Sequence, residues 1–265
     1  MRKLLLVLPL IAFMLVFGCT KDDSNPTGPG GGGPAAPTNV TIQTTNDGLG
    51  IIITWTAVAN ADSYMVQTPD ADVTVAGNQT TYTDNAPANM GIYRVRAYDD
   101  NTAGDWSSSH STTPEYGYGI QIGEWTHSTT WACYYWDANG NGHLMSSQIA
   151  SGYDPALVDI FLYDNNTNNF YFYGGQTAPT NPGYKNTYLA EDIGGTYITY
   201  APPEGNNYWK TGTQNPLNTT TYYWVELENG HYVRLSVTSL AVGPQNKDVI
   251  FSWWWQPVQG FRYVE

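Results

Sequence analysis

The stretch Ile51-Ile52-Ile53-Thr54-Trp55-Thr56 shows most clearly how the chain folds. Large apolar residues occupy every odd-numbered position, and threonine occupies two of the three even-numbered ones. Because successive side chains of a β-strand point to opposite faces, this period of two predicts a strand with one buried face. The same pattern recurs at Tyr64 and Val66 and at Tyr93, Val95 and Ala97. Short strands separated by turn sequences predict an antiparallel β-sandwich over residues 37–112.

Five separate motifs in this region carry a family resemblance. They are Pro37-Thr38-Asn39-Val40, Ile53-Thr54-Trp55, Ala61-Asp62-Ser63-Tyr64, Gly91-Ile92-Tyr93-Arg94-Val95-Arg96-Ala97 and Gly104-Asp105-Trp106-Ser107. At these residues the stretch resembles a fibronectin type III domain. The resemblance implies that Trp55 lies in the core, that Met90 takes the place of the family's leucine, and that Tyr93 forms a tyrosine corner, its hydroxyl bonding to nearby backbone. The loop over residues 99–105 contains no Arg-Gly-Asp, so we expect this domain to act as a spacer.

A second domain is expected over residues 113–265, beginning at Thr113-Pro114-Glu115. Alternation recurs in this region, and Asn229-Gly230 is a hairpin signal because both turn positions favour positive φ. Trp253-Trp254-Trp255 lies in the last predicted strand. About ten strands and no helix are predicted, so the chain as a whole is all-β and its second domain is an antiparallel sandwich or open barrel.

The composition limits the classes of partner. With 10 basic and 23 acidic residues the net charge is −13, and removal of Arg2 and Lys3 with a signal leaves 8 basic residues against 23 acidic ones, or −15. A chain this acidic cannot hold a polyanion by neutralising phosphates, so nucleic acid is excluded as a partner. If Cys19 carries lipid, Cys133 has no partner for an intramolecular disulfide.

The first residues predict export. Met1-Arg2-Lys3 is a short basic head, residues 4–17 are apolar, and Gly18 precedes Cys19. The apolar run is shorter than the roughly 18–20 residues that a membrane-spanning helix needs, so we interpret residues 1–18 as a signal peptide. Gly18 and Cys19 resemble the bacterial lipobox, which implies a lipid on Cys19 and a membrane partner. The alternative is a plain cleaved signal with an incidental cysteine.

The segment after Cys19 predicts the membrane to which the anchored protein is sent. Lys21-Asp22-Asp23 resembles the short acidic signal that sends some lipoproteins to the exterior of the outer membrane, although a solvated charge cluster would look the same. Residues 19–36 are rich in glycine and proline, with an unbroken glycine run at 30–33. Such a composition cannot bury apolar surface and predicts a flexible tether.

No catalytic or metal motif is convincing. Asp137 to Gln148 fits part of a calcium loop, but Gln148 offers a neutral amide where a bidentate carboxylate is needed, so a hairpin turn on Asn141-Gly142 is the better interpretation. The sequence contains neither Gly-x-Ser-x-Gly nor His-Glu-x-x-His. We therefore expect a protein that is not an enzyme and needs no cofactor, with a polysaccharide-acting enzyme as the less favoured alternative.

Aromatic surface is the remaining resource for binding. If Trp253 and Trp255 face the core, Trp254 faces outward, where an indole offers an apolar face and an N–H donor for stacking on sugar rings, unless another element covers it. Trp254 is therefore the first candidate for binding an extracellular ligand such as a glycan.

A second resemblance leads to the alternative ligand, haem. Val158-Asp159-Ile160-Phe161-Leu162-Tyr163, Asn229-Gly230-His231-Tyr232-Val233-Arg234-Leu235 and Gly260-Phe261-Arg262-Tyr263 look like the late part of the HmuY lipoproteins, some of which capture haem. The motifs include no haem ligands of that family. His127, His143, His231 and Met145 are the available nitrogen and sulfur ligands, and His143 and Met145 would share one face of a regular strand, which could suit haem iron.

Overall fold

A computed structural model describes residues 32–125, 131–146, 154–164, 169–177, 185–192, 195, 197, 199–203, 208–242 and 247–264. Residues 1–31 lie outside these ranges, so the signal peptide, Cys19 and most of the tether are not described, and neither are His127 and Gln148. The described chain is all-β, as predicted, with two short 3-10 turns at Pro155–Leu157 and Gly175–Thr177. No helix in these ranges is long and apolar enough to span a membrane.

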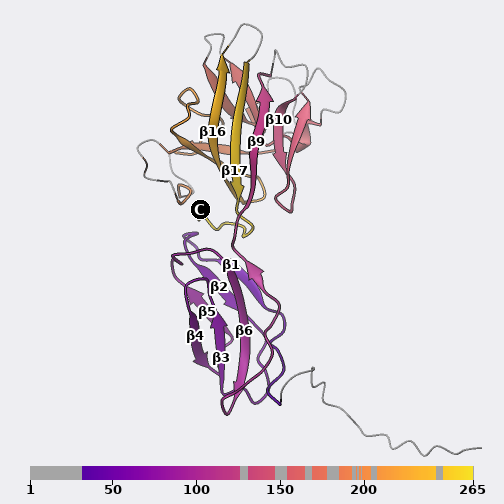
Figure 1. The fold of residues 1–265 in the computed structure, drawn as a ribbon, viewed down its shortest axis with the longest axis vertical. Helices are drawn as coiled ribbons and strands as arrows, with labels where there is room; N and C mark the ends of the chain where they lie inside the picture. The colour runs from indigo at the N-terminus through magenta and orange to yellow at the C-terminus, as the bar shows by residue number, and fades with distance from the viewer. Residues whose placement is uncertain are drawn as a thin grey trace, which may run out of the picture.

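The first domain is the predicted sandwich of two antiparallel sheets (Figure 1). One sheet has the order β1-β2-β5, and the other has the order β4-β3-β6-β7, with β8 also pairing with β6. Their bounds are β1 Thr41–Thr44, β2 Ile51–Thr54, β3 Ser63–Gln67, β4 Asp72–Ala76, β5 Thr81–Asp84, β6 Ile92–Asp99, β7 Thr102–Ala103 and β8 His110–Ser111.

The residues expected inside this sandwich are inside. Its core contains Ile51, Ile53, Trp55, Tyr64, Val66, Tyr93, Val95 and Ala97, and Met90 packs against it. The tyrosine corner differs from the expectation, because the Tyr93 hydroxyl donates to the Asp84 carboxylate at 2.8 Å instead of to backbone. Burial of the ring and this carboxylate raise the pKa of Tyr93, which keeps its hydroxyl protonated as the donor.

The second domain is also an open sandwich, and not a closed barrel. One sheet has the order β11-β10-β12-β13 and the other β14-β15-β16-β17-β9, with every pairing antiparallel. The strands are β9 Glu115–Gly123, β10 Trp131–Trp136, β11 Gly142–Ser146, β12 Ile160–Asp164, β13 Phe170–Gly174, β14 Tyr188–Glu191, β15 Tyr222–Glu226, β16 Tyr232–Val242 and β17 Lys247–Trp255. Leu162, Phe172, Val225, Leu235 and Phe251 are among the buried side chains between the sheets.

The hairpin between β15 and β16 lies where Asn229-Gly230 predicts it, but its turn type is different. Gly230 has φ 76°, whereas Asn229 is not in the positive-φ region. The backbone N–H of Gly230 donates to Leu227 O at 2.8 Å, and that of Leu227 donates to His231 O at 2.9 Å. The turn is therefore closed by one left-handed glycine, and the expectation of positive φ at both positions is wrong.

The last residues of the chain join the two domains. Val258, Phe261 and Tyr263 are buried in the same cluster as Trp55 and Ile53 of the first sandwich. The carboxyl terminus accordingly lies at the junction between the domains in Figure 1. A segment expected to belong to the second domain thus completes the core of the first.

Polar contacts fix this segment at the junction. The Gln256 side chain is fully buried, and its Nε2 donates to the Thr112 carbonyl at 3.2 Å. Arg262 donates from Nη1 to Asp47 O at 3.0 Å and from Nε to Ala201 O at 2.7 Å. Since these bonds satisfy groups that would be costly to bury alone, the junction is a specific interface.

We predict that Phe261→Ala destabilises the first sandwich about as much as Trp55→Ala does. Both side chains are at most 5 % exposed in one core, and truncating such a ring typically costs about 3–5 kcal/mol. Thermal and urea unfolding of the full chain would measure the change, with Ile92→Ala, at a side chain 50 % exposed, as the control. A Phe261→Ala protein that melts with the control would show that the terminal segment does not contribute to this core.

Candidate functional site

Strand β17 places its three tryptophans as the alternation predicts. Trp253 and Trp255 are 5 % and 3 % exposed and lie in the core between the sheets. Trp254 points to the opposite, outer face of the five-stranded sheet, where it is half-buried. The predicted direction of Trp254 is therefore confirmed, and the half-burial has an identifiable cause in its neighbours.

Arg234 and Tyr118 cover part of Trp254. In the register of the sheet Arg234 on β16 is opposite Trp254, and its guanidinium lies over the Trp254 ring at 4.7 Å and over the Tyr222 ring at 4.9 Å. Tyr118 meets Trp254 edge to face, with ring centroids 6.4 Å apart. A planar guanidinium held between two rings is a favourable cation–π arrangement, so Trp254 fixes Arg234 and is not a bare platform for a ligand.

Two exposed rings of this face belong to the neighbouring strand β9. Tyr116, opposite Trp254 in the register, is 59 % exposed, and Tyr118 is 63 % exposed. Their centroids are 4.9 Å apart. We call Tyr116, Tyr118 and Trp254 the aromatic patch. Its two tyrosines offer large apolar faces with polar tips, which suits a ligand that has both C–H surfaces and hydroxyl groups.

His143 and Met145 lie on the same face of β11, but their side chains differ in burial and in contacts. Met145 is 5 % exposed and is packed with Cys133 and Trp125. His143 is half-buried, stacks on Tyr135 at 4.7 Å and has its Nε2 3.2 Å from the Asp137 carboxylate. One side chain is thus enclosed and the other has partners of its own, so the described residues do not bring both to one open cavity.

The candidate calcium loop is a hairpin turn. Asp137 Oδ1 accepts from the backbone of Asn139 at 2.8 Å and of Asn141 at 3.0 Å, and Oδ2 accepts from Asn141 Nδ2 at 2.9 Å. These bonds, the Asn141 side chain first, lower the pKa of Asp137 to about 2. The backbone N–H of Gly140 donates to Asp137 O at 3.0 Å, so Ala138 and Asn139 are at the centre of the turn and Gly140 follows them with φ 81°. The expected turn on Asn141-Gly142 is therefore wrong.

A buried acid elsewhere in the domain also has a structural explanation. Asp159 is fully buried, which raises the pKa of its carboxyl to about 6. Its Oδ2 accepts from the Trp136 backbone at 2.9 Å and lies 3.2 Å from Lys185 Nζ. Perturbed carboxyl groups often indicate catalysis, but this one is fully engaged in joining β10 to the segment before β14.

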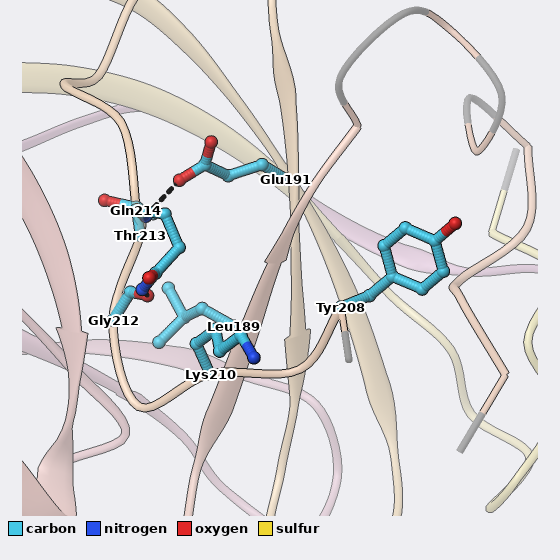
Figure 2. A pocket seen from close by; sticks show the side chains of 7 residues that line it. All are labelled: Leu189, Glu191, Tyr208, Lys210, Gly212, Thr213 and Gln214. Atoms are coloured by element: carbon cyan, nitrogen blue, oxygen red, sulfur yellow. Dashed lines mark hydrogen bonds between the residues drawn. The ribbon is translucent and has the colours of Figure 1, made fainter. Parts of the chain in front are cut away.

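A small hollow of about 130 Å³ lies beside β14. Figure 2 shows Glu191 reaching the backbone of Gln214, while the ring of Tyr208 points away from that carboxylate. Glu191 also accepts from Asn215 N at 2.8 Å and Asn215 Nδ2 at 2.7 Å. Its carboxylate therefore holds the loop in place. Tyr208, 47 % exposed, is the accessible ring of this hollow.

Sequence reasoning found Trp254 but missed Tyr116 and Tyr118. Both tyrosines lie among glycines in Glu115–Gly123, which reads as a domain boundary more than as a strand. The signal that could have found them is the alternation of tyrosine with glycine. In a strand this alternation places both tyrosines on one face and the glycines on the other, where they leave room for the packed Trp253 ring. A Cβ on Gly117 would lie 2.5 Å from that ring.

Comparisons with known proteins identify no family for the chain. No family model matches it, and no curated protein matches it. A solved structure entitled "Structure of FN3tt mut" is similar over 31 % of this chain and 96 % of that chain, at 15 % sequence identity and a TM-score of 0.25. The resemblances to lipoproteins and to HmuY stay predictions.

We predict that Trp254→Ala destabilises the second sandwich by about 1–2 kcal/mol, because it uncovers the stacked Arg234. Tyr116→Ala, at an exposed ring of the same patch, should change stability by less than about 0.5 kcal/mol. Urea unfolding of both variants would measure the difference. Equal stability of the two variants would contradict a packing role for Trp254.

Proposed function

We propose that the chain is a lipid-anchored protein facing the exterior of the outer membrane, whose second sandwich binds a neutral glycan without catalysis. The first sandwich and the tether would hold the binding domain away from the lipid. Two acyl chains make a durable anchor, whereas one gives only marginal membrane binding. The support for the anchor comes from Gly18-Cys19 and its apolar run.

The aromatic patch carries the proposal of glycan binding. Tyr116 and Tyr118 expose most of their surface side by side, although large aromatic side chains gain free energy by burial. Sugar rings present C–H faces that pack on such rings, and their hydroxyls can bond to the phenol groups. The net charge of −13 repels polyanionic polysaccharides, so a neutral glycan is the class that fits.

We predict that Tyr118→Ala weakens binding to a neutral glycan by about tenfold, which corresponds to about 1.4 kcal/mol. The measurement is a glycan array followed by titration of the full chain with the best-retained oligosaccharide. Tyr208→Ala is the matched control, since it removes an exposed tyrosine at the separate hollow beside β14.

Four outcomes would contradict this assignment. Binding lost in Tyr208→Ala but kept in Tyr118→Ala would move the site to the hollow, and absence of retention on every glycan would reject the ligand class. Release of cleaved sugar would show an enzyme. A Soret shift on adding haem, altered by His143→Ala, would favour the haem alternative.

We predict that the mature amino terminus is an acylated Cys19. Intact-mass analysis of the protein extracted from membranes should show the mass of the chain from residue 19 plus lipid. Cys19→Ser should release the protein from the membrane fraction, because the sulfur that carries the lipid is gone. An unmodified amino terminus at any residue would refute the anchor.

A further inference from the structure

The second sandwich has two sides where its sheets end, and only one of them is closed by a described segment. Between the edge strands β13 and β14, the segment 210–213 closes the side: Lys210 N donates to Leu189 O at 2.8 Å, and Thr213 N donates to Phe172 O at 2.9 Å. Isolated bridges join Leu189 to Lys210 and Tyr173 to Gly212. The opposite side lies between the edge strands β9 and β11, and no described strand bridges it.

On this opposite side a groove of about 410 Å³ remains. Its floor includes Leu144 and Trp131, which are 38 % and 46 % exposed. Leu144 is paired with the buried Tyr134 in the register of the sheet, so it points to the inner face of the four-stranded sheet. It stays exposed because the facing sheet ends at β9. Among the described residues, the groove is therefore core surface of the sandwich that no strand covers.

The edge of β9 presents backbone groups to the same groove. Glu124 N donates to Lys247 O at 2.8 Å, so in the antiparallel ladder Glu124 and Ile122 bond to β17. The N–H and C=O groups of the alternate residues, Gln121 and Gly123, point away from β17, and both residues line the groove. Strand β9 contains neither lysine nor proline, the residues that usually block an edge.

The outer rim of the groove carries one carboxylate and, among its lining residues, no basic side chain. Asp248 on β17 lines it, and its Oδ2 accepts from Gln121 Nε2 at 2.8 Å. Gly123, opposite Asp248, has no side chain to cover the carboxylate, which is half-buried beside Gln121. Together with the net charge of −13, this rim favours a basic partner over an acidic one.

We propose that this groove binds an extended polypeptide as an added strand on the edge of β9. The added strand would lie over Leu144 and Trp131 and extend the five-stranded sheet to cover them. Its inward side chains would be apolar, and its outward side chains, beside Asp248, would be basic. Strand addition of this kind takes affinity from backbone hydrogen bonds and specificity from alternate side chains. The proposal does not depend on glycan binding by the aromatic patch.

The test uses the full mature chain in detergent and labelled peptides of about six residues, the usual length of a strand. A peptide alternating valine with lysine should bind, measured by fluorescence anisotropy. A peptide alternating valine with glutamate should bind at least about tenfold more weakly, because its carboxylates face Asp248. Methylation of alternate backbone nitrogens should abolish binding, since it removes the donors of the added strand.

Two variants separate recognition from misfolding. Leu144→Lys should abolish binding, because it places a charge on the floor of the groove. Asp248→Lys should invert the preference towards the valine–glutamate peptide, a gain of binding that an unfolded protein could not show. The aromatic-patch variant Tyr118→Ala should bind the valine–lysine peptide like wild type.

Four results would overturn the proposal. The first is undiminished binding of the methylated peptide, and the second is an unchanged charge preference in Asp248→Lys. The third is a dimer, seen in sedimentation, that Leu144→Lys dissociates. The fourth is binding of a neutral oligosaccharide, abolished by Trp131→Ala, while no peptide binds. The third result would make a second copy of the chain the occupant, and the fourth would make the groove a sugar site.

Discussion

One hydrogen bond in the second core links the two sheets of that sandwich. The indole N–H of Trp253 on β17 donates to the hydroxyl of Tyr134 on β10 at 2.8 Å. Burial raises the pKa of Tyr134 to about 12, so the hydroxyl stays neutral at the centre of the core. Since side chains alternate along a strand, this bond also sets the faces of the neighbouring residues: Trp255 turns inward with Trp253, and Trp254 turns outward to Arg234.

The same packing explains where the sequence must have glycine. A Cβ on Gly142 would lie 2.1 Å from the Tyr134 hydroxyl, and one on Gly140 would lie 2.2 Å from the Trp255 ring. Gly140 additionally has φ 81°, which other residues rarely adopt. The β10–β11 hairpin is thus shaped by Tyr134 of β10 itself and by Trp255 of the facing sheet, and the left-handed Gly140 ends the turn that spans Asp137 to Gly140.

Much of the fold was predictable from the sequence because it rests on local alternation. Ile51, Ile53 and Trp55 are buried together, and Trp254 points outward, as a period of two requires. The place of Phe261 in the first core was not predictable, because it depends on a contact between segments far apart in the chain. The candidate site was predictable only in part: alternation gives the direction of Trp254 but not that Arg234 stacks on it, and the exposed tyrosines of β9 depend on that strand being at a sheet edge.

The terminal segment in the first core has a mechanical consequence. Two domains joined by one peptide link can swivel about it. Here the covalent link near Thr112 is accompanied by a second attachment, in which Phe261 and Tyr263 are embedded in the other domain and Arg262 bonds to its backbone at Asp47. Two attachments side by side restrict rotation of one domain relative to the other. A torque applied to the second sandwich is therefore transmitted to the first, and the aromatic patch keeps its direction relative to the whole molecule.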